Sequence, residues 1–594
     1  PAGRAVAAAV AISAGTPALT YSAFEQRVNR LARHLISLGG IAPEVPVAVA
    51  MRRSVEMVVA LHAVLAAGGV YVPVDPEQPD ERLSYLLDTA DPRLVLTTSG
   101  EEIGTGRTVV NIDASMCPAT RATRSARTNG MPRCGRRTRR TCCSHRGSTG
   151  RPKGVAVSHE AVVNQLSWMQ AEYLLNASDV VLLKTPATFD ASVWELLWPF
   201  ASGAQMAIAE PDGHRDPAYL ARALVDMGVT VAQFVPTVLD AVLDLVDEPT
   251  PALRLVFAGG EALPVSTALR ARTWFDAQVH NLYGPTEVTM QATHRHGGEA
   301  VAGGSHVPIG APVWNTDGWV LDARMRPVPV GVVGELYLSG NQLARGGYAA
   351  QPRLTAERFV ANPFGGAGQR MYRTGDLARW NRNGGELEYA GRIDEQVKLR
   401  GGQRIELGEI ESVLREFDSV AAGAVAVRSD RLVGYVVPDG EVSTSVLRAA
   451  MGAVLPSFMV PSSFVMLDAL PLNASGKLDR KALPDPVFEV REFRPPVNGV
   501  EQAVAAVFED VLGIERVGLD DDFFALGGNS LVATQVTARL RAELNSEVPL
   551  QLLFRDSTVE GLAGLIAGAA ELIGTHAIGP PMLPLREHGS GGRP

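Results

Sequence analysis

The sequence predicts an α/β protein: a large N-terminal domain of layered sheets and helices, a small α+β subdomain, and then an all-α four-helix domain. Strand-like and helix-like runs alternate from Leu19 onward, which is typical of largely parallel sheets covered by helices. A proline-containing stretch at 484–500 reads as a linker. Helical spacing returns after it, at 504–512 and in an amphipathic run ending at Leu544.

The first elements follow from the spacing of apolar residues. Phe24, Val28 and Leu31 recur at helical intervals, and Gly39 is placed to end that helix. The alanine-rich start lacks the cleavage site and polar flank of a signal peptide, so it reads better as a strand. We expect a strand within 5–14, a helix within 19–39, a strand at 45–51, a helix at 54–67 and a strand within GGVYVPVDP at 68–76.

Bulk composition excludes several classes of protein. The 594 residues are 46% hydrophobic and 20% charged, with a net charge of −9, which is ordinary for a soluble α/β enzyme and argues against nucleic acid as the main partner. No run of 18 apolar residues occurs, so we expect no membrane span. Four cysteines indicate a reducing, cytoplasmic setting. The length predicts three or four domains, and the start at Pro1 indicates a piece of a longer protein.

A glycine-rich loop, GSTGRPKG at 147–154, is the first candidate for chemistry. Glycines allow backbone N–H groups to approach phosphate oxygens, and Ser148, Thr149 and Lys153 add hydroxyls and an ammonium. The spacing differs from the common GxxxxGK[ST] nucleotide loop. Taken alone, the loop favours the simpler interpretation as a flexible polar turn before an apolar strand, and only the motifs downstream favour a phosphate-binding role.

The segment just before this loop, 114–146, differs from the rest of the chain. It holds nine arginines, no acidic residue, no lysine and all four cysteines, Cys117, Cys134, Cys142 and Cys143. Adjacent cysteines with the single His145 are poor zinc ligands. A basic nucleic-acid arm lacks interleaved aromatic residues and contradicts the overall charge.

A frameshift explains this segment better. Codons for the last residues before the loop, read two bases out of step, permit PDAAYVLFTSG running into Ser148. We therefore hypothesise a compensated frameshift that begins after about Asp113 and ends at Arg146–Gly147. An arginine-rich stretch in place of a core strand would leave unpaired buried charges. We expect impaired folding and activity in that case, and resequencing the gene tests the hypothesis.

Several polar residues downstream have both a structural and a functional interpretation. Asp190 in FDASVWE is either a helix N-cap or an anchor for a substrate ammonium group. Asp376 in YRTGDL either caps a turn or binds a vicinal diol. NLYGPTE at 281–287 contains a Gly-Pro turn. Ser530 is either a plain N-cap or a modified serine, and Lys477 after Gly476 is by default a solvated lysine.

The ordered motifs decide between these interpretations. STGRPKG, FDAS, NLYGPTE, GELYLSG, YRTGDL, GRIDEQVK and PLNASGKLDR occur in one chain. Together they resemble the adenylate-forming superfamily, specifically the amino-acid-activating (adenylation) domains of non-ribosomal peptide synthetases. DDFFALGGNSL at 521–531 resembles the signature of a carrier (thiolation) domain. The resemblance covers about 15–113 and 147–570.

The resemblance implies an adenylation core at 1–393, a mobile C-terminal subdomain at 394–484, a linker at 485–499, a carrier domain at 500–571 and a tail at 572–594. It implies that ATP and an amino acid form aminoacyl-AMP, which is then transferred as a thioester to 4′-phosphopantetheine. Magnesium, a phosphopantetheinyl transferase and neighbouring condensation or thioesterase domains are the expected cofactor and partners. No nucleic acid and no membrane are expected to take part.

Roles carry over to matching positions of this sequence. The resemblance implies that Lys477, Thr286 and Lys153 are catalytic, Glu287 binds magnesium, Asp394 is the hinge and Ser530 carries the phosphopantetheine. It places ATP against Gly147, Ser148, Thr149, Gly150, Tyr283, Asp376, Tyr389 and Arg392. It lines the amino-acid pocket with Asp190, Ala191, Trp194, Gln233, Val256, Ala258, Leu282, Met290 and Gln291. One extra glycine at 401–402 departs from the family pattern in a loop expected to touch the incoming thiol arm.

The pocket residues favour a medium or large side chain that can hydrogen-bond, glutamine-like first and aromatic second. Two alternatives stay open. One is an adenylate-forming ligase for a carboxylic acid without an amine, against which Asp190 argues. The other is an inactivated remnant that acts only as a carrier or scaffold.

Overall fold

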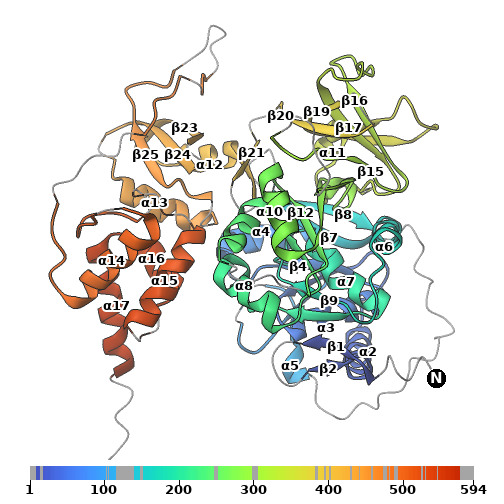
Figure 1. The fold of residues 1–594 in the computed structure, drawn as a ribbon, viewed down its shortest axis with the longest axis horizontal. Helices are drawn as coiled ribbons and strands as arrows, with labels where there is room; N and C mark the ends of the chain where they lie inside the picture. Colours follow the sequence, from blue (N-terminus) through green and yellow to red (C-terminus); the bar gives the residue numbers. More distant parts are fainter. Residues whose placement is uncertain are drawn as a thin grey trace, which may run out of the picture. The chain divides into compact units, whose positions relative to one another are not determined.

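The computed structural model describes residues 8–13, 18–101, 103–104, 106–115, 139–146, 152–245, 252–297, 305–344, 346–381, 385–393, 396–399, 403–428, 431–440, 442–456, 459–471, 478–480, 482–486, 493–514, 516–523, 526, 528, 530–544, 546 and 548–574. The chain divides into two compact units (Figure 1). One comprises Pro1–Val460 with Met466–Leu483, and the other comprises Pro461–Val465 with Pro484–Pro594.

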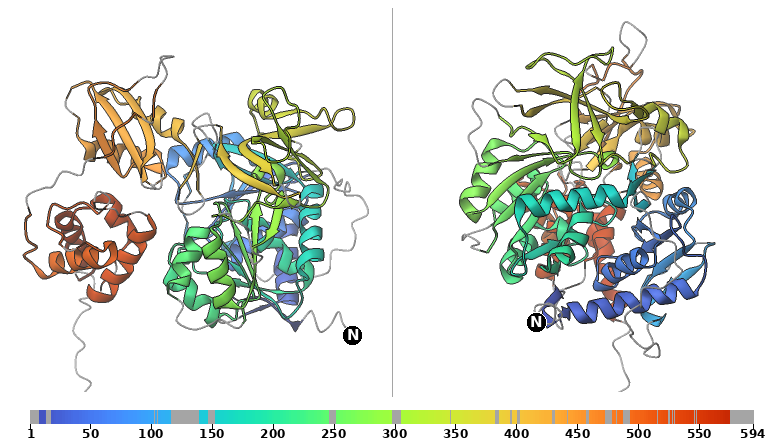
Figure 2. Two further views of the ribbon diagram at one scale, coloured as in Figure 1. Left: turned by 45° about the horizontal axis from the view of Figure 1, so that its top comes forward. Right: turned by 90° about the vertical axis from the view of Figure 1, so that its right-hand side faces the viewer.

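A nine-stranded sheet forms the centre of the first unit (Figure 2). Its strand order is β15-β14-β13-β12-β11-β9-β10-β1-β2, and the run from β13 to β1 is parallel. Helices join these strands, as expected for parallel pairing. The strands are β1 (Val10–Ser13), β2 (Leu19–Thr20), β9 (Val180–Leu183), β10 (Gln205–Ile208), β11 (Val231–Phe234), β12 (Leu255–Gly259), β13 (Gln278–Tyr283), β14 (Thr293–His296) and β15 (Ala311–Pro312); the helices are α6 (His159–Tyr173), α7 (Ser192–Ser202), α8 (Pro217–Asp226), α9 (Pro236–Leu243) and α10 (Val265–Phe275), with the 3-10 turns η1 (Gly213–Arg215) and η2 (Thr286–Val288).

A six-stranded sheet of order β6-β5-β3-β4-β7-β8 lies in the same unit. Helix α2 confirms the helix predicted from apolar spacing, because its buried side chains include Phe24, Val28 and Leu31. Thr20 caps α2 and Ser54 caps α3. The strands are β3 (Pro46–Ala50), β4 (Val70–Val74), β5 (Leu94–Thr97), β6 (Val109–Asn111), β7 (Arg139–Arg146) and β8 (Pro152–Ser158); the helices are α2 (Tyr21–Ser37), α3 (Val55–Ala66), α4 (Asp80–Ala90) and α5 (Ile112–Ser115).

A third sheet, which is antiparallel, follows these two largely parallel sheets. It is built from β16 (Thr316–Leu321), β17 (Gly334–Gly340), β18 (Phe359–Ala361), β19 (Arg370–Trp380) and β20 (Leu387–Arg392), with α11 (Pro352–Arg358) before β18. The long strand β19 pairs with β17, β18 and β20. This sheet carries Asp376 and Arg392 into the candidate site.

The region after β20 mixes helices and strands, as the predicted α+β subdomain requires. It contains β21 (Gln396–Leu399), β22 (Gln403–Glu406), α12 (Leu407–Leu414), β23 (Val420–Arg428), β24 (Arg431–Pro438), α13 (Thr444–Val454) and β25 (Ser463–Met466). Arg82 of α4 and Glu409 of α12 form an ion pair of 2.7 Å with side chains 7% and 2% exposed. The boundary at 394 stays a prediction.

The second unit confirms the predicted helical domain. It contains α14 (Gly499–Leu512), α15 (Ser530–Leu544), α16 (Leu550–Arg555) and α17 (Val559–Gly574). Asn498 and Glu501 form a capping box at the start of α14, so this helix begins at the last residue of the expected linker. Phe508 and Phe523 are fully buried, with ring centroids 5.1 Å apart. No helix within the described residues is long and apolar enough to cross a membrane.

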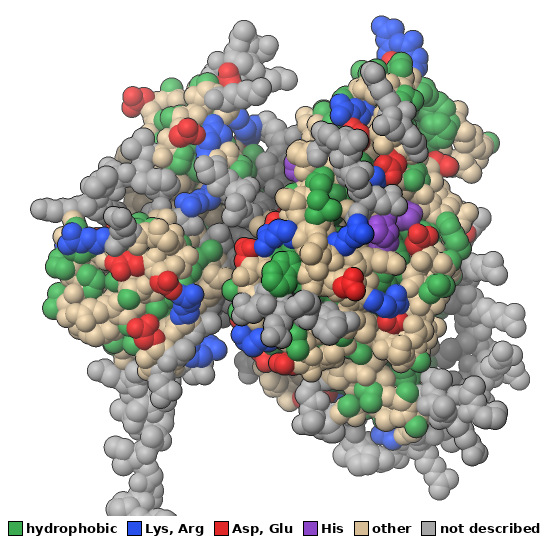
Figure 3. All heavy atoms as spheres, viewed as in Figure 1, with side chains coloured by type: hydrophobic (Ala, Val, Ile, Leu, Met, Phe, Trp, Pro, Cys, Tyr) green, Lys and Arg blue, Asp and Glu red, His purple; other side chains and the backbone are tan. Residues whose placement is uncertain are grey.

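Charged side chains of both signs are interspersed on the face shown in Figure 3. This distribution agrees with the modest negative net charge of the sequence.

Candidate active site

The predicted amino-acid pocket lies at one edge of the nine-stranded sheet. Ligands of open parallel sheets bind beyond the carboxyl ends of the strands. The loop after β9 carries Asp190, and neighbouring β11 carries Gln233. Further along, β12 contributes Ala258 and β13 ends in Leu282 and Tyr283. The sheet order therefore brings together residues that are distant in sequence.

Trp194 joins α7 to this edge. Its indole Nε1 donates a hydrogen bond of 2.7 Å to Oε1 of Gln233, and its ring centroid lies 5.3 Å from that of Phe257. The N-cap of α7 is Ala191, whose side chain makes no capping hydrogen bond. The interpretation of Asp190 as a helix N-cap is therefore wrong, because Asp190 precedes the cap by one residue.

Glu195 fixes the loop that carries Asp190, a role that the sequence reasoning missed. Its carboxylate accepts hydrogen bonds from the backbone N–H groups of Lys184 and Thr185, at 3.2 and 3.0 Å, and from the Thr185 hydroxyl at 2.6 Å. Burial raises the pKa of Glu195 and lowers the pKa of Lys184 to about 8. An acidic residue inside the apolar FDASVWELLW run was the available signal.

The turn after β13 positions Met290 and Gln291. A Cβ at Gly284 would collide with the backbone of Met290, so this position requires glycine. Thr289 and Met290 adopt left-handed backbone angles, with φ of 52° and 69°. Such strain costs about 1–3 kcal/mol per residue and concentrates at functional sites.

Tyr283, Asp376 and Arg392 form the predicted nucleotide cluster. The Tyr283 hydroxyl donates to Oδ2 of Asp376 at 2.6 Å, and Nη1 of Arg392 donates to Oδ1 at 2.6 Å. Burial and the neighbouring carboxylate raise the pKa of Tyr283 well above its usual value. Asp376 lies within β19, so its interpretation as a turn cap is wrong. Tyr389 lies on β20 of the same antiparallel sheet, opposite Ala378 of β19.

Lys153 and Glu287 both contact Tyr348. The Tyr348 hydroxyl donates to Oε1 of Glu287 at 2.5 Å, and Nζ of Lys153 lies 5.1 Å from the Tyr348 ring centroid. The backbone N–H of Ala349 donates to the carbonyl of Gly154 at 2.7 Å, which fixes the strand after the glycine-rich loop. Glu287 and Thr286 are 1% and 3% exposed.

Glu287 fits the expected magnesium ligand. Mg²⁺ is usually held by one or two carboxylates together with substrate phosphates and water. Within the described residues, no group of three or more His, Cys, Asp or Glu side chains could hold a metal by itself. A single buried carboxylate beside a lysine suits an ion that arrives with a nucleotide.

Some predicted residues cannot be placed. Gly147, Ser148, Thr149, Gly150, Lys477 and Asp394 lie outside the described residues. Ser530 is the first residue of α15. Their roles stay predictions.

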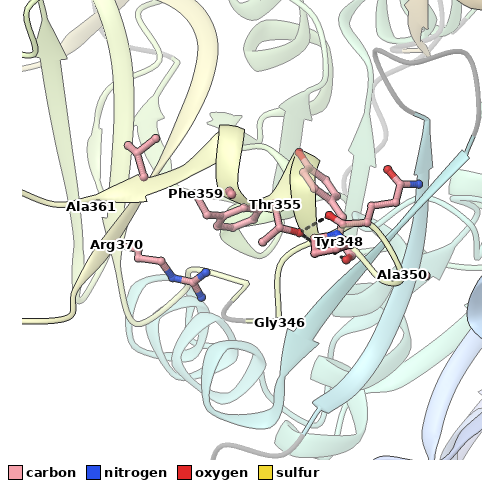
Figure 4. Close-up of a pocket in the computed structure, with 11 residues that line it drawn as sticks. Gly346, Tyr348, Ala350, Thr355, Phe359, Ala361 and Arg370 are labelled. Atoms are coloured by element: carbon pink, nitrogen blue, oxygen red, sulfur yellow. Dashed lines mark hydrogen bonds between the residues drawn. The ribbon is translucent and has the colours of Figure 1, made fainter.

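A hollow of about 700 Å³ lies beside Tyr348 (Figure 4). Thr355, Phe359 and Arg370 are among the residues that line it, and none of the predicted amino-acid pocket residues does. The sequence reasoning did not predict this hollow.

The fold and the candidate site define a class of protein. It has an α/β core with a candidate nucleotide site, followed by a four-helix unit in which α15 begins at Ser530, the candidate phosphopantetheine attachment residue. The model of AMP-binding enzymes matches residues 2–348, that of the AMP-binding enzyme C-terminal domain matches 409–477, and that of the phosphopantetheine attachment site matches 502–566. The chain belongs to the AMP-binding enzymes, as an adenylation and carrier domain pair of the non-ribosomal peptide synthetase type.

Curated relatives agree with this assignment. Phosphinothricin tripeptide synthetase PhsB of Streptomyces viridochromogenes is 45% identical over 92% of this chain and 47% of its own length. Tyrocidine synthase 3 of Brevibacillus parabrevis is 42% identical over 95% of this chain and 9% of its own length. Enterobactin synthase component F of Escherichia coli is 42% identical over 96% of this chain and 45% of its own length. The chain thus spans less than half the length of these relatives.

Solved structures of non-ribosomal peptide synthetase proteins are similar to this chain. A holo NRPS protein containing adenylation and PCP domains, bound to a vinylsulfonamide inhibitor, has a TM-score of 0.76 and 26% identity, with 94% of each chain covered. A four-domain nonribosomal peptide synthetase bound to AMP and glycine has a TM-score of 0.58 and 31% identity, over 95% of this chain and 42% of its own. ATP with Mg²⁺ and 4′-phosphopantetheine are therefore the cofactors of this pair of domains.

Proposed function

We propose that this chain activates an amino acid with ATP and loads it as a thioester on the phosphopantetheine arm of Ser530. The observation that carries the proposal is the shared sheet edge: the loop after β9 holds Asp190, and β13 ends in Tyr283 just before Thr286 and Glu287. An ammonium-binding carboxylate and a nucleotide site at one edge are what the reaction needs.

In the first half-reaction, a carboxylate oxygen of the amino acid attacks the α-phosphorus of ATP, and pyrophosphate leaves with its magnesium. Asp190, which is half-buried, pairs with the substrate ammonium, because a carboxylate partly removed from water gains from a nearby opposite charge. Lys153 and Lys477 neutralise the charge on the phosphate oxygens, the Thr286 hydroxyl donates a hydrogen bond to them, and Asp376 binds the ribose. Positioning and electrostatic stabilisation supply most of the catalysis in such transfers.

In the second half-reaction, the thiol of the arm attacks the carbonyl carbon of aminoacyl-AMP. A thioester forms, AMP leaves, and the thiol proton passes to solvent. We propose that the C-terminal subdomain of the adenylation domain rotates at Asp394. The rotation withdraws Lys477 and admits the phosphopantetheine arm. A phosphopantetheinyl transferase must first modify Ser530, and condensation or thioesterase domains would use the loaded product.

ATP–pyrophosphate exchange with each of the twenty amino acids tests the proposal. We expect exchange with one or a few amino acids, and at least a tenfold loss of kcat/KM in Asp190→Asn. The matched control Asp226→Asn, on the exposed end of α8, should leave the exchange unchanged.

Loading is tested separately by mass spectrometry after treatment with a phosphopantetheinyl transferase. Ser530→Ala should lose the mass shift of the arm and the loaded amino acid while exchange continues. Exchange only with carboxylic acids that lack an amine would favour the broader ligase. Attachment of the arm without any adenylate would favour the carrier remnant.

A further inference from the structure

Two glutamine side chains of the amino-acid pocket have their amide orientations fixed by neighbours. Gln233 lies on β11 and Gln291 follows the turn after β13; they are 9% and 4% exposed. A primary amide has a carbonyl that accepts and an amino group that donates. Whichever end a neighbour engages, the opposite end is left for the substrate.

Trp194 fixes the first amide. An indole N–H can only donate, so the 2.7 Å contact from Nε1 of Trp194 must engage the carbonyl oxygen of Gln233. Trp194 is fully buried and its ring packs against Trp198 and Phe257, so the indole has little freedom to turn. The Nε2 amino group of Gln233 therefore faces away from Trp194 as a donor.

A chain of buried amides fixes the second. Nε2 of Gln342 donates to Oε1 of Gln165 at 2.6 Å, and Nε2 of Gln165 donates to Oε1 of Gln291 at 2.7 Å. Gln165 and Gln342 are fully buried, and Oε1 of Gln342 has no hydrogen-bond partner among the described residues, so the chain of amides ends there. The carbonyl of Gln291 is thus engaged, and its amino group is also left as a donor.

The other predicted side-chain contacts are apolar: Ala191, Trp194, Val256, Ala258, Leu282 and Met290. A neutral environment disfavours a charged substrate side chain, because burying an ion without a counter-ion is costly. Two amide donors in an apolar setting suit an uncharged hydrogen-bond acceptor. Sites built to hydrogen-bond a substrate group reject analogues that lack it far more strongly than apolar sites reject a change of size.

We infer that the amino acid activated here has an uncharged side chain with a carbonyl-type acceptor, as in a side-chain carboxamide, and that Gln165 and Gln342 are positioning residues for this selectivity. The inference rests on the proposed function and names its substrate class. It predicts that the ranking of amino acids by kcat/KM depends on whether the amino group or the carbonyl of Gln233 and Gln291 faces the pocket.

Pyrophosphate exchange with glutamine, asparagine, glutamate, ornithine, leucine and phenylalanine tests the inference in the parent protein. We expect a carboxamide amino acid to lead, by at least tenfold in kcat/KM over ornithine and leucine. Gln233→Glu keeps an oxygen for the Trp194 N–H and replaces the donor by a second oxygen. It should reverse the preference toward ornithine by about a hundredfold or more.

Gln165→Met tests the positioning role. It removes both amide contacts at similar volume, so we expect a higher KM for the carboxamide substrate, a nearly unchanged kcat and weaker discrimination against ornithine. Gln26→Glu, on the exposed face of α2, is the control for both variants. Thermal unfolding of each variant shows whether the fold is retained.

The outcomes separate the two claims. Exchange led by an aliphatic or a cationic amino acid overturns the inference alone, as does an unchanged order of substrates in a folded Gln233→Glu protein. Absence of exchange with every amino acid overturns the proposed function, and the inference with it.

Discussion

Tyr283 and Asp376 are 93 residues apart in sequence and are joined by a hydrogen bond of 2.6 Å between the phenol and Oδ2. The first residue ends a parallel strand of the central sheet, and the second lies in the middle of the antiparallel sheet. Arg392 engages the other carboxylate oxygen. The residues predicted to bind the nucleotide therefore come from two sheets, and both oxygens of the Asp376 carboxylate accept hydrogen bonds within the protein.

Asp376→Asn should weaken ATP binding. The change removes the negative charge that pairs with Arg392. It also puts an amide NH₂ in place of one carboxylate oxygen, where it faces the donor group of Tyr283 or Arg392. Breaking a buried charged pair costs about 3–5 kcal/mol. We expect the KM for ATP to rise at least tenfold in exchange assays, with Tyr283→Phe showing a smaller rise. Asp322→Asn, in an exposed turn, serves as control, and an unchanged KM in Asp376→Asn would contradict the assignment.

Glu287→Gln should lower kcat and increase the magnesium concentration needed for activity. An amide oxygen is a weaker ligand for Mg²⁺ than a carboxylate, and loss of an electrostatic contact to the phosphates typically costs about 10²–10³ in rate. A magnesium titration of exchange activity is the measurement. Glu357→Gln, whose side chain is 53% exposed, should behave as the parent; an identical magnesium curve for Glu287→Gln argues against a metal ligand.

Glu195→Gln should raise the KM for the amino acid more than it changes kcat. Oε2 of Glu195 accepts from both backbone N–H groups at the start of the loop that ends in Asp190, and Oε1 accepts from the Thr185 hydroxyl. The amide keeps one accepting oxygen but removes the negative charge that interacts with the buried Lys184. The loop should lose order while the phosphate site stays intact. Separate KM and kcat values for amino acid and ATP are the readout, with exposed Glu172→Gln as control. Equal losses for both substrates would indicate general destabilisation.

His280 should make the protein less stable as the pH falls. Burial, followed by the charges of His296 and His294, lowers its pKa from 6.5 to about 3, and neither ring nitrogen has a hydrogen-bond partner among the described residues. Between these values the unfolded chain takes up a proton that the folded protein does not. The free energy of unfolding therefore falls with decreasing pH, by up to about 1.4 kcal/mol per unit.

His280→Phe removes this pH dependence, and the neighbouring rings of Tyr173 and Phe257 offer an aromatic environment. Urea unfolding at several pH values between 3 and 7 should show a shallower decline than in the parent. His306→Gln, at an exposed position, should keep the parental slope. The same slope in His280→Phe would show that other groups titrate.

The frameshift hypothesis predicts a gain in stability when the reading frame is restored. β7 lies between β4 and β8, and Thr141 pairs with the buried Tyr71. Strands inside such sheets are normally continuous apolar runs, whereas β7 reads RRTCCSHR. The sequence PDAAYVLFTSG before Ser148 should raise the unfolding midpoint and the exchange rate.

Replacing the exposed Arg353 by alanine controls for a simple loss of positive charge. Equal unfolding midpoints for the parent and the restored protein, together with clean sequencing reads across the segment, would remove the hypothesis.

The sequence alone predicted the fold class and many of the elements, and it supplied the candidate site residues, whose roles stay predictions. Apolar spacing predicted α2 with its buried Phe24, Val28 and Leu31, because the side that faces the core is a local property of a helix. Motif order predicted the adenylation and carrier domains, and the motifs contain the candidate residues Asp190, Tyr283, Glu287 and Asp376.

Only the tertiary structure decided which of these groups meet and how they are oriented. It moved Asp190 outside the α7 cap and Asp376 from a turn into β19, and it revealed Glu195, Gln165 and Gln342 as supports. These contacts depend on strand order and on side chains far apart in the chain. Local spacing does not encode them, because a hydrogen bond forms only where the complete fold brings a donor to an acceptor.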